Sequence, residues 1–281
     1  MGNEKDHMKP KEPDSDTYMQ QLAVTGPLME APIRSALQAL QLPLGSRGLD
    51  AGCGIGLQIP LLAEAVGTAG HVTGLDISPE FLSRAMEIAQ EAGILDRIAF
   101  QEGDVKRLPF DDNTFDWAWS ANCVGYGLVR PDPSLSELAR VVKPGGSVAV
   151  LIWSSEHLLP GYPRLEARLR ATSSGIAPFT EDRKPEFHFL RSLGWFREVG
   201  LKEPAAQTFA GSAYAPLSDD IRRALSALID MRWPDIQPEL TPKDWEEYQR
   251  LCLPESPDYI LNLPDYYAFF TYSMFHGKAV E

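Results

Sequence analysis

Short apolar runs alternate with segments of helical periodicity through much of the chain, and this order predicts the class of fold. Strands that alternate with helices in this way form a parallel sheet with helices on its faces. The apolar runs predict strands at 48–51, 71–76, 97–101, 115–120 and 147–153. Further on, an aromatic-rich strand is predicted at 266–276, and residues 205–214 are compatible with one more strand.

The helix expected after the second strand has the clearest boundary signals. Ser78 is a favoured N-cap residue, Pro79 suits the first helical position, and Gly93 is a typical stop. Other apolar repeats predict a helix that begins near Leu57 and one or two helices within 19–42. Helices are also predicted at 133–142, 185–199, 221–231 and 245–251.

Changes in composition divide the chain into segments. Residues 1–17 are polar and contain two prolines, which predicts a disordered leader before an N-terminal helical segment at 18–44. Residues 45–215 and 264–281 are predicted to form one α/β domain. The helical, mostly acidic segment between them predicts a cap at 216–263, inserted late in the sheet.

Three glycines directly after the first predicted strand indicate a ligand site. Gly52, Gly54 and Gly56 let the backbone turn tightly and approach a ligand beside the positive end of a helix. A dinucleotide fingerprint would need its third glycine at Leu57, so the spacing disfavours a pyrophosphate. A nicotinamide-dependent oxidoreductase therefore remains only as an alternative.

Carboxylates follow the next two predicted strands. Asp76 ends the second strand, where its two oxygens suit the hydroxyls of a ribose. Asp104 follows the third strand and suits the exocyclic amine of an adenine. Because ligands bind at the carboxyl edge of such sheets, these residues together predict an adenosine-containing ligand.

Several segments in a fixed order resemble the class I S-adenosylmethionine-dependent methyltransferases, and most closely their small-molecule, quinone-biosynthesis group. The segments are Leu49–Gly56, Gly74–Ser78, Gly103–Val105, Leu108–Phe110, Phe115-Asp116 and Leu138–Gly146. The resemblance implies a Rossmann-like three-layer fold with a seven-stranded, mostly parallel sheet whose last strand is antiparallel. It implies in-line transfer of a methyl group to an O, N or C atom of a small molecule, with S-adenosylhomocysteine as product.

The resemblance also implies a cofactor contact for each matching position. The residues implied at the methionine end are Asp50, Gly52, Gly54, Gly56, Ser120 and Ala121, with Tyr18 facing the sulfonium from the N-terminal segment. The residues implied at the adenosine end are Asp76, Ile77, Asp104 and Val105. For Tyr18, an ordinary role in packing is an equal alternative.

The acceptor side has weaker signals. The candidates for lining an acceptor pocket are Asn122, Tyr126, Trp233 and Tyr266, although core positions are the simpler interpretation of the last two. His157, after the fifth strand, is a weak candidate for a general base, with an exposed loop histidine as the alternative. His188, between two phenylalanines, is expected to be a packing residue.

Composition narrows the choice of partner. The chain has 281 residues and a net charge of -13, which disfavours binding to nucleic acid. Its three cysteines are far apart and no apolar run is long enough for a membrane span, so we expect a cytoplasmic protein without disulfides.

No metal is predicted, because no His and carboxylate cluster has ligand spacing. A non-catalytic cofactor-binding protein on the same fold remains an alternative, and the oligomeric state is left open.

Overall fold

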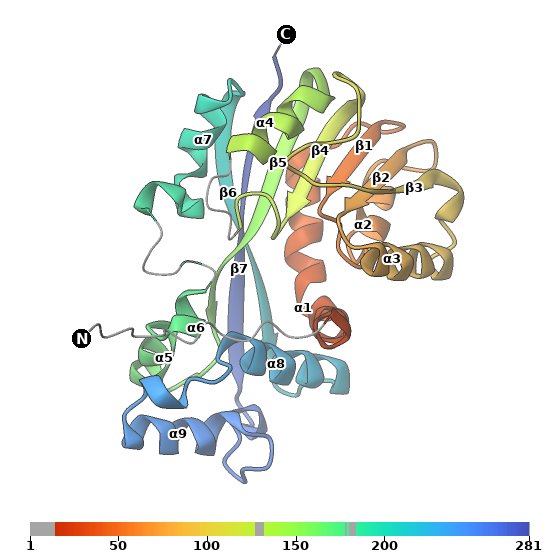
Figure 1. The fold of residues 1–281 in the computed structure, drawn as a ribbon. Helices are drawn as coiled ribbons and strands as arrows, with labels where there is room; N and C mark the ends of the chain where they lie inside the picture. The colour runs from red at the N-terminus through yellow and green to blue at the C-terminus, as the bar shows by residue number, and fades with distance from the viewer. Residues whose placement is uncertain (1–14, 127–131, 178, 180–183, 281) are drawn as a thin grey trace, which may run out of the picture.

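A seven-stranded sheet forms the centre of the molecule (Figure 1). The structure is a computed structural model that describes residues 15–126, 132–177, 179 and 184–280. The strands lie in the order β3-β2-β1-β4-β5-β7-β6. Their bounds are β1 Arg47–Ala51, β2 His71–Asp76, β3 Ile98–Glu102, β4 Phe115–Ala121, β5 Val142–His157, β6 Lys202–Tyr214 and β7 Tyr267–Lys278. Strands β1 to β5 pair in parallel and β7 is antiparallel to both its neighbours, which confirms the predicted topology.

The helices connect and cover the strands. Their bounds are α1 Ser15–Leu40, α2 Ile59–Ala65, α3 Pro79–Glu91, α4 Asp132–Val141, α5 Pro163–Arg170, α6 Ser173–Ile176, α7 Ser192–Glu198, α8 Asp219–Arg232 and α9 Pro242–Cys252. Short 3-10 turns are η1 Leu95–Arg97, η2 Pro185–Phe187, η3 Phe189–Arg191, η4 Gln237–Glu239 and η5 Ile260–Asn262. As predicted, the Ser78 hydroxyl caps α3 by accepting a hydrogen bond from the Phe81 amide. In the described part of the chain, no helix is both long and apolar enough to cross a bilayer.

Both faces of the sheet are buried at its central strands, which explains why β1, β2 and β4 are apolar runs rather than alternating ones. On one face, α1 and α2 pack against Trp117 and Trp119 of β4. On the other face, α4 and α7 cover apolar residues of β1, β4 and β5. The carboxyl ends of β1, β2 and β3 therefore open at one edge of a three-layer sandwich.

A second apolar core lies beyond this edge, where β5, β6 and β7 extend toward a group of helices, called the cap below (α5, α6, α8 and α9; Figure 1). Leu165 and Leu169 of α5 pack there with Leu225 and Ile229 of α8. The sequence predicted a cap from 216–263 only. In the structure the segment after β5 contributes to the same core.

Three local predictions differ from the structure. The N-terminal segment is one helix from Ser15, with Pro27 and Pro32 inside it, because contacts with α2, α8 and β6 hold it together. Residues 1–14 of the predicted leader lie outside the described residues. Strand β5 starts at Val142, not 147, because Gly145 and Gly146 exchange backbone hydrogen bonds with Ala279. The helix predicted at 185–199 starts only at Ser192, after two 3-10 turns.

Candidate functional site

The glycine loop between β1 and α2 is held against the end of β2. The amides of Gly52 and Cys53 both donate to the carbonyl of Leu75, at 2.7 and 2.9 Å. The three glycines at 52, 54 and 56 all have positive φ, between 54° and 79°. A side chain at 54 would project into open space, which keeps the loop accessible to a ligand.

Asp76 fastens this loop from the end of β2. One carboxylate oxygen accepts a hydrogen bond from the Gly54 amide at 2.8 Å, and the other accepts one from the Ser78 amide at 3.0 Å. Ile77, the next residue, is 68% exposed, which is unusual for a large apolar side chain. Asp76 therefore offers hydrogen-bond acceptors directly beside the exposed apolar side chain of Ile77.

Asp50 is a buried carboxylate whose Oδ2 atom has no hydrogen-bond partner. Its side chain is at the end of β1, and the residue is only 2% exposed. Burial raises the pKa of Asp50 to about 8, and the negative charge of Asp76 adds to this shift. A ligand with a positively charged amino group would satisfy both the oxygen and the charge, so the site fits the methionine end of S-adenosylmethionine.

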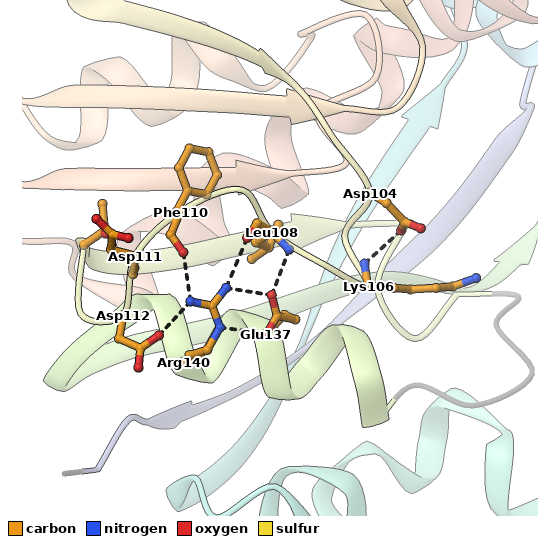
Figure 2. Close-up of polar contacts among 9 residues, drawn as sticks. Asp104, Lys106, Leu108, Phe110, Asp111, Asp112, Glu137 and Arg140 are labelled. Atoms are coloured by element: carbon orange, nitrogen blue, oxygen red, sulfur yellow. Dashed lines mark hydrogen bonds and ion pairs between the residues drawn. The ribbon is translucent and has the colours of Figure 1, made fainter.

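The loop after β3 carries Asp104 and is anchored to α4 by Arg140 (Figure 2). The Arg140 guanidinium makes five hydrogen bonds, and their partners are Glu137 (twice), Asp112 and the carbonyls of Leu108 and Phe110. Asp104 is exposed, and its carboxylate accepts from the Lys106 amide at 2.8 Å. Val105 packs against the core below the loop. The Arg140 contacts thus hold the segment that carries Asp104 in place.

Two side chains at the end of β4 form hydrogen bonds with the neighbouring strands. The buried Ser120 hydroxyl donates to the Ala51 carbonyl at 2.7 Å and accepts from the Val124 amide at 3.1 Å. The Asn122 side chain accepts from the Trp153 amide of β5 at 2.8 Å. The Ser120 hydroxyl is therefore already bonded within the protein, and Asn122, predicted to line a pocket, instead links β4 to β5.

Tyr18 reaches the same edge from α1. Partial burial raises the pKa of its phenol, and Cys123 and Asp76 add to the shift. The ring centroid lies 6.1 Å from that of Phe81 in α3. Tyr18 thus lies beside α3, the helix that follows Asp76, and its contact with the sulfonium stays a prediction.

A cavity of about 390 Å³ opens beyond β5, between the sheet and the cap. Several aromatic side chains form part of its wall. The lining residues are Tyr126, Trp153, Ser154, Ser155, Glu156, Arg170, Gly175, Ile176, Ala177, Phe179, His188, Phe189 and Arg232. Of the predicted lining residues, only Tyr126 is among them. Burial raises the pKa of the Tyr126 phenol. The Tyr126 amide donates to the Cys123 carbonyl at 3.1 Å, and the Cys123 side chain lies against Gly52, so this segment joins the glycine loop to the cavity.

The other predicted acceptor-side residues lie elsewhere. Trp233 and Tyr266 are each 1% exposed in the core of the cap, where the Tyr266 hydroxyl donates to the Leu158 carbonyl. His157, the weak candidate base, places its Nδ1 atom 3.2 Å from Glu166 and its ring against Phe269, outside the cavity wall. Trp233 and Tyr266 therefore do not line the cavity as predicted, because their side chains fill the core of the cap.

His188 lines the cavity instead, although the sequence indicated a packing role. Its ring does pack between Phe179 and Phe189, at centroid distances of 4.5 and 4.6 Å. Burial lowers its pKa, so the ring is neutral at pH 7. Its Nδ1 atom accepts from the Leu190 amide at 3.3 Å, so the neutral ring carries its proton on Nε2 and is a hydrogen-bond donor.

Glu156 and Arg232 were not singled out from the sequence. One Glu156 oxygen accepts from Arg232 Nε at 3.0 Å, and the other accepts from the Trp153 indole at 2.5 Å. Arg232 also donates to the Gly175 carbonyl at 2.9 Å. Because 76 residues separate Glu156 from Arg232, no local pattern links them.

Comparisons with known proteins agree with this geometry. A family model described as "Methyltransferase domain" matches residues 49–146. The demethylmenaquinone methyltransferase of Bacillus licheniformis is 34% identical over 194 residues, covering 64% of this chain and 80% of that protein. That of Staphylococcus epidermidis is 37% identical over 197 residues, covering 65% and 78%.

Solved structures share the fold. A SAM-dependent methyltransferase from Aquifex aeolicus superposes with a TM-score of 0.50 at 23% identity, covering 66% of this chain and 88% of that one. The [4+2]-cyclase SpnF superposes with a TM-score of 0.54 at 19% identity, covering 95% of each chain. The fold and the cofactor edge define a class I methyltransferase. The chain belongs to the S-adenosylmethionine-dependent methyltransferase family, and S-adenosylmethionine is its cofactor.

Proposed function

We propose that this methyltransferase acts on a small, partly aromatic molecule bound in the cavity between β5 and the cap. The observation that carries the proposal is the position of Tyr126, which lines the cavity and whose amide donates to the carbonyl of Cys123, a residue whose side chain lies against Gly52 of the glycine loop. A cavity of about 390 Å³ with a partly aromatic wall has the size and lining of a small-molecule site. The quinone-related acceptors named for the relatives support this class of acceptor.

For the cofactor we propose the contacts implied by the resemblance. Asp50 would hold the amino group, the backbone at 52–56 and 120–121 would surround the methionine end, and Asp76 would bind the ribose. Ile77 would lie against the adenine ring, with Asp104 and Val105 at its edge. S-adenosylmethionine supplies an electrophilic methyl group on a positively charged sulfur. The protein then needs chiefly to orient the acceptor in line and to exclude water.

The cavity offers no free general base among the described residues. Both oxygens of Glu156 already accept hydrogen bonds, and the neutral His188 ring donates rather than accepts at Nε2. We therefore propose that the acceptor is already nucleophilic near neutral pH, as a phenolate, an activated ring carbon or a neutral amine is. Such an acceptor needs no general base, so the proposal assigns no such role to His157.

The experiment is a transfer assay with methyl-labelled S-adenosylmethionine and a panel of reduced quinones, phenols and amines. We expect labelled product and stoichiometric S-adenosylhomocysteine with at least one phenol or reduced quinone. Asp76→Ala should remove most cofactor affinity, because it deletes a ligand contact and the anchor of the Gly54 amide. Asp96→Ala, an exposed carboxylate outside the site, is the matched control.

The same assay separates the alternatives. Tight cofactor binding without transfer to any acceptor would refute the proposal and favour a cofactor-binding protein or another chemistry, since SpnF, a [4+2]-cyclase, has this fold. Unchanged cofactor affinity in Asp76→Ala would refute the assignment of the ribose site.

A further inference from the structure

The acceptor cavity has more cationic than anionic side chains. The cationic side chains also leave more of their hydrogen-bonding atoms without a partner. Among the described residues that line it, Arg170 and Arg232 are cationic and Glu156 is anionic. Glu156 is 3% exposed, and each of its oxygens already has a partner. The anionic group is therefore occupied by the protein itself, while the guanidinium groups have donors to spare.

Arg170, at the end of α5, has the more incomplete set of contacts. Its Nη2 atom forms an ion pair with Glu166 at 3.5 Å but no hydrogen bond, and its Nε atom is buried without any hydrogen-bond partner. Glu166 itself is shared, because its carboxylate also accepts from the Leu158 amide at 2.5 Å. By contrast, Arg140 makes five hydrogen bonds in the loop after β3. Buried guanidinium donors without acceptors are uncommon and point to a missing partner.

Arg232 faces the cavity from the end of α8. Its Nε atom donates to Glu156 and one terminal nitrogen donates to the Gly175 carbonyl, which fixes the plane of the guanidinium. The other terminal nitrogen, Nη1, has no hydrogen bond to the described residues, and the side chain is 18% exposed. Glu156 is thus a positioning residue that orients Arg232 with a donor left over.

We infer that the acceptor carries a carboxylate and that Arg170, with Arg232, binds it. A carboxylate matches the planar donors of a guanidinium and forms charge-assisted hydrogen bonds that are stronger than neutral ones. The attraction between opposite charges is stronger beside apolar side chains than in bulk water. The body of the acceptor would lie against Phe179, Phe189 and Trp153. This inference rests on the proposed function and narrows it to aromatic or apolar acids.

The test compares 1-naphthoate with 1-naphthamide, its neutral analogue of similar shape. Binding of each probe is measured by calorimetry with S-adenosylhomocysteine present at saturation. We expect naphthoate to bind the wild-type protein at least about tenfold more tightly than naphthamide. Equal affinities, or a preference for naphthamide, would overturn the inference.

Variants assign the preference to Arg170. Arg170→Gln should lower naphthoate affinity about tenfold or more and leave naphthamide affinity unchanged, and Arg170→Lys should restore part of the preference. Arg164→Gln, an exposed arginine on the same helix outside the cavity wall, is the control and should match the wild type. A purely structural role for Arg170 predicts that both probes weaken together, which would overturn the assignment.

Failure of this inference is distinguishable from failure of the proposed function. Methyl transfer to a neutral phenol, without any preference for naphthoate, would refute the carboxylate site and leave the methyltransferase proposal intact. A preference for naphthoate without transfer to any acceptor would support the carboxylate site and refute the methyltransferase proposal.

Discussion

Asp50→Asn is expected to change the stability of the protein and its affinity for the cofactor in opposite directions. The substitution keeps the size of a side chain that is 2% exposed, and removes its ability to ionise. In the folded protein, burial and then the neighbouring Asp76 raise the pKa of this carboxyl from 3.8 to about 8. The unfolded chain therefore releases a proton that the folded protein retains at neutral pH.

The sign of the effect follows from this difference. The contribution of Asp50 to stability is most favourable below pH 3.8, falls as the pH rises toward 8, and is constant above that value. At about 1.4 kcal/mol per pH unit, the loss at pH 7 is up to about 4 kcal/mol. Asparagine does not titrate, so we expect Asp50→Asn to be more stable than the wild type at pH 7, with a smaller difference near pH 4.5.

Cofactor binding should change in the opposite direction. A charge-assisted hydrogen bond to the amino group is worth about 2 kcal/mol, so S-adenosylhomocysteine should bind the variant roughly 30-fold more weakly at pH 8. Wild-type affinity should rise with pH toward 8, as Asp50 becomes ionised, and variant affinity should be nearly flat. Urea unfolding and calorimetry at several pH values measure both effects. A variant that is less stable at pH 7, or that keeps the wild-type pH slope of binding, would refute the reasoning.

Two further predictions concern the glycine loop and the rejected base. Gly56→Ala should lower the free energy of unfolding by about 2–4 kcal/mol in thermal denaturation, because its Cβ would lie 2.7 Å from that of Ala85 at φ +79°. Gly54→Ala, whose Cβ meets nothing within 4 Å, should cost only about 1 kcal/mol but weaken cofactor binding; equal destabilisation of the two variants would contradict this distinction. His157→Gln should keep kcat within about twofold of the wild type, because its ring contacts Glu166 and Phe269 outside the cavity. A large fall in kcat with an intact fold would return His157 to the reaction.

Local sequence patterns predicted most of the sheet and the cofactor edge. The strand bounds at 71–76 and the Ser78 cap of α3 agree with the structure, because each depends on neighbouring residues in the chain. The glycines at 52–56 predicted a tight turn that the positive φ angles confirm. Gly56 shows a limit of such patterns, since its small size is required by α3 rather than by the ligand site.

The acceptor cavity depends on contacts that no local pattern contains. Residues from β5, α5, α6 and α8 meet there, and the sequence pointed to His157 without indicating its neighbour Glu156. Adjacent residues of a strand point to opposite faces, so the register of β5 within the sheet decides which of the two faces the cavity. The sequence by itself determined the fold class, the cofactor edge and the chemistry expected there, because short-range spacing encodes them. The tertiary structure alone decided which side chains face the acceptor, because burial and strand register depend on the whole packed chain.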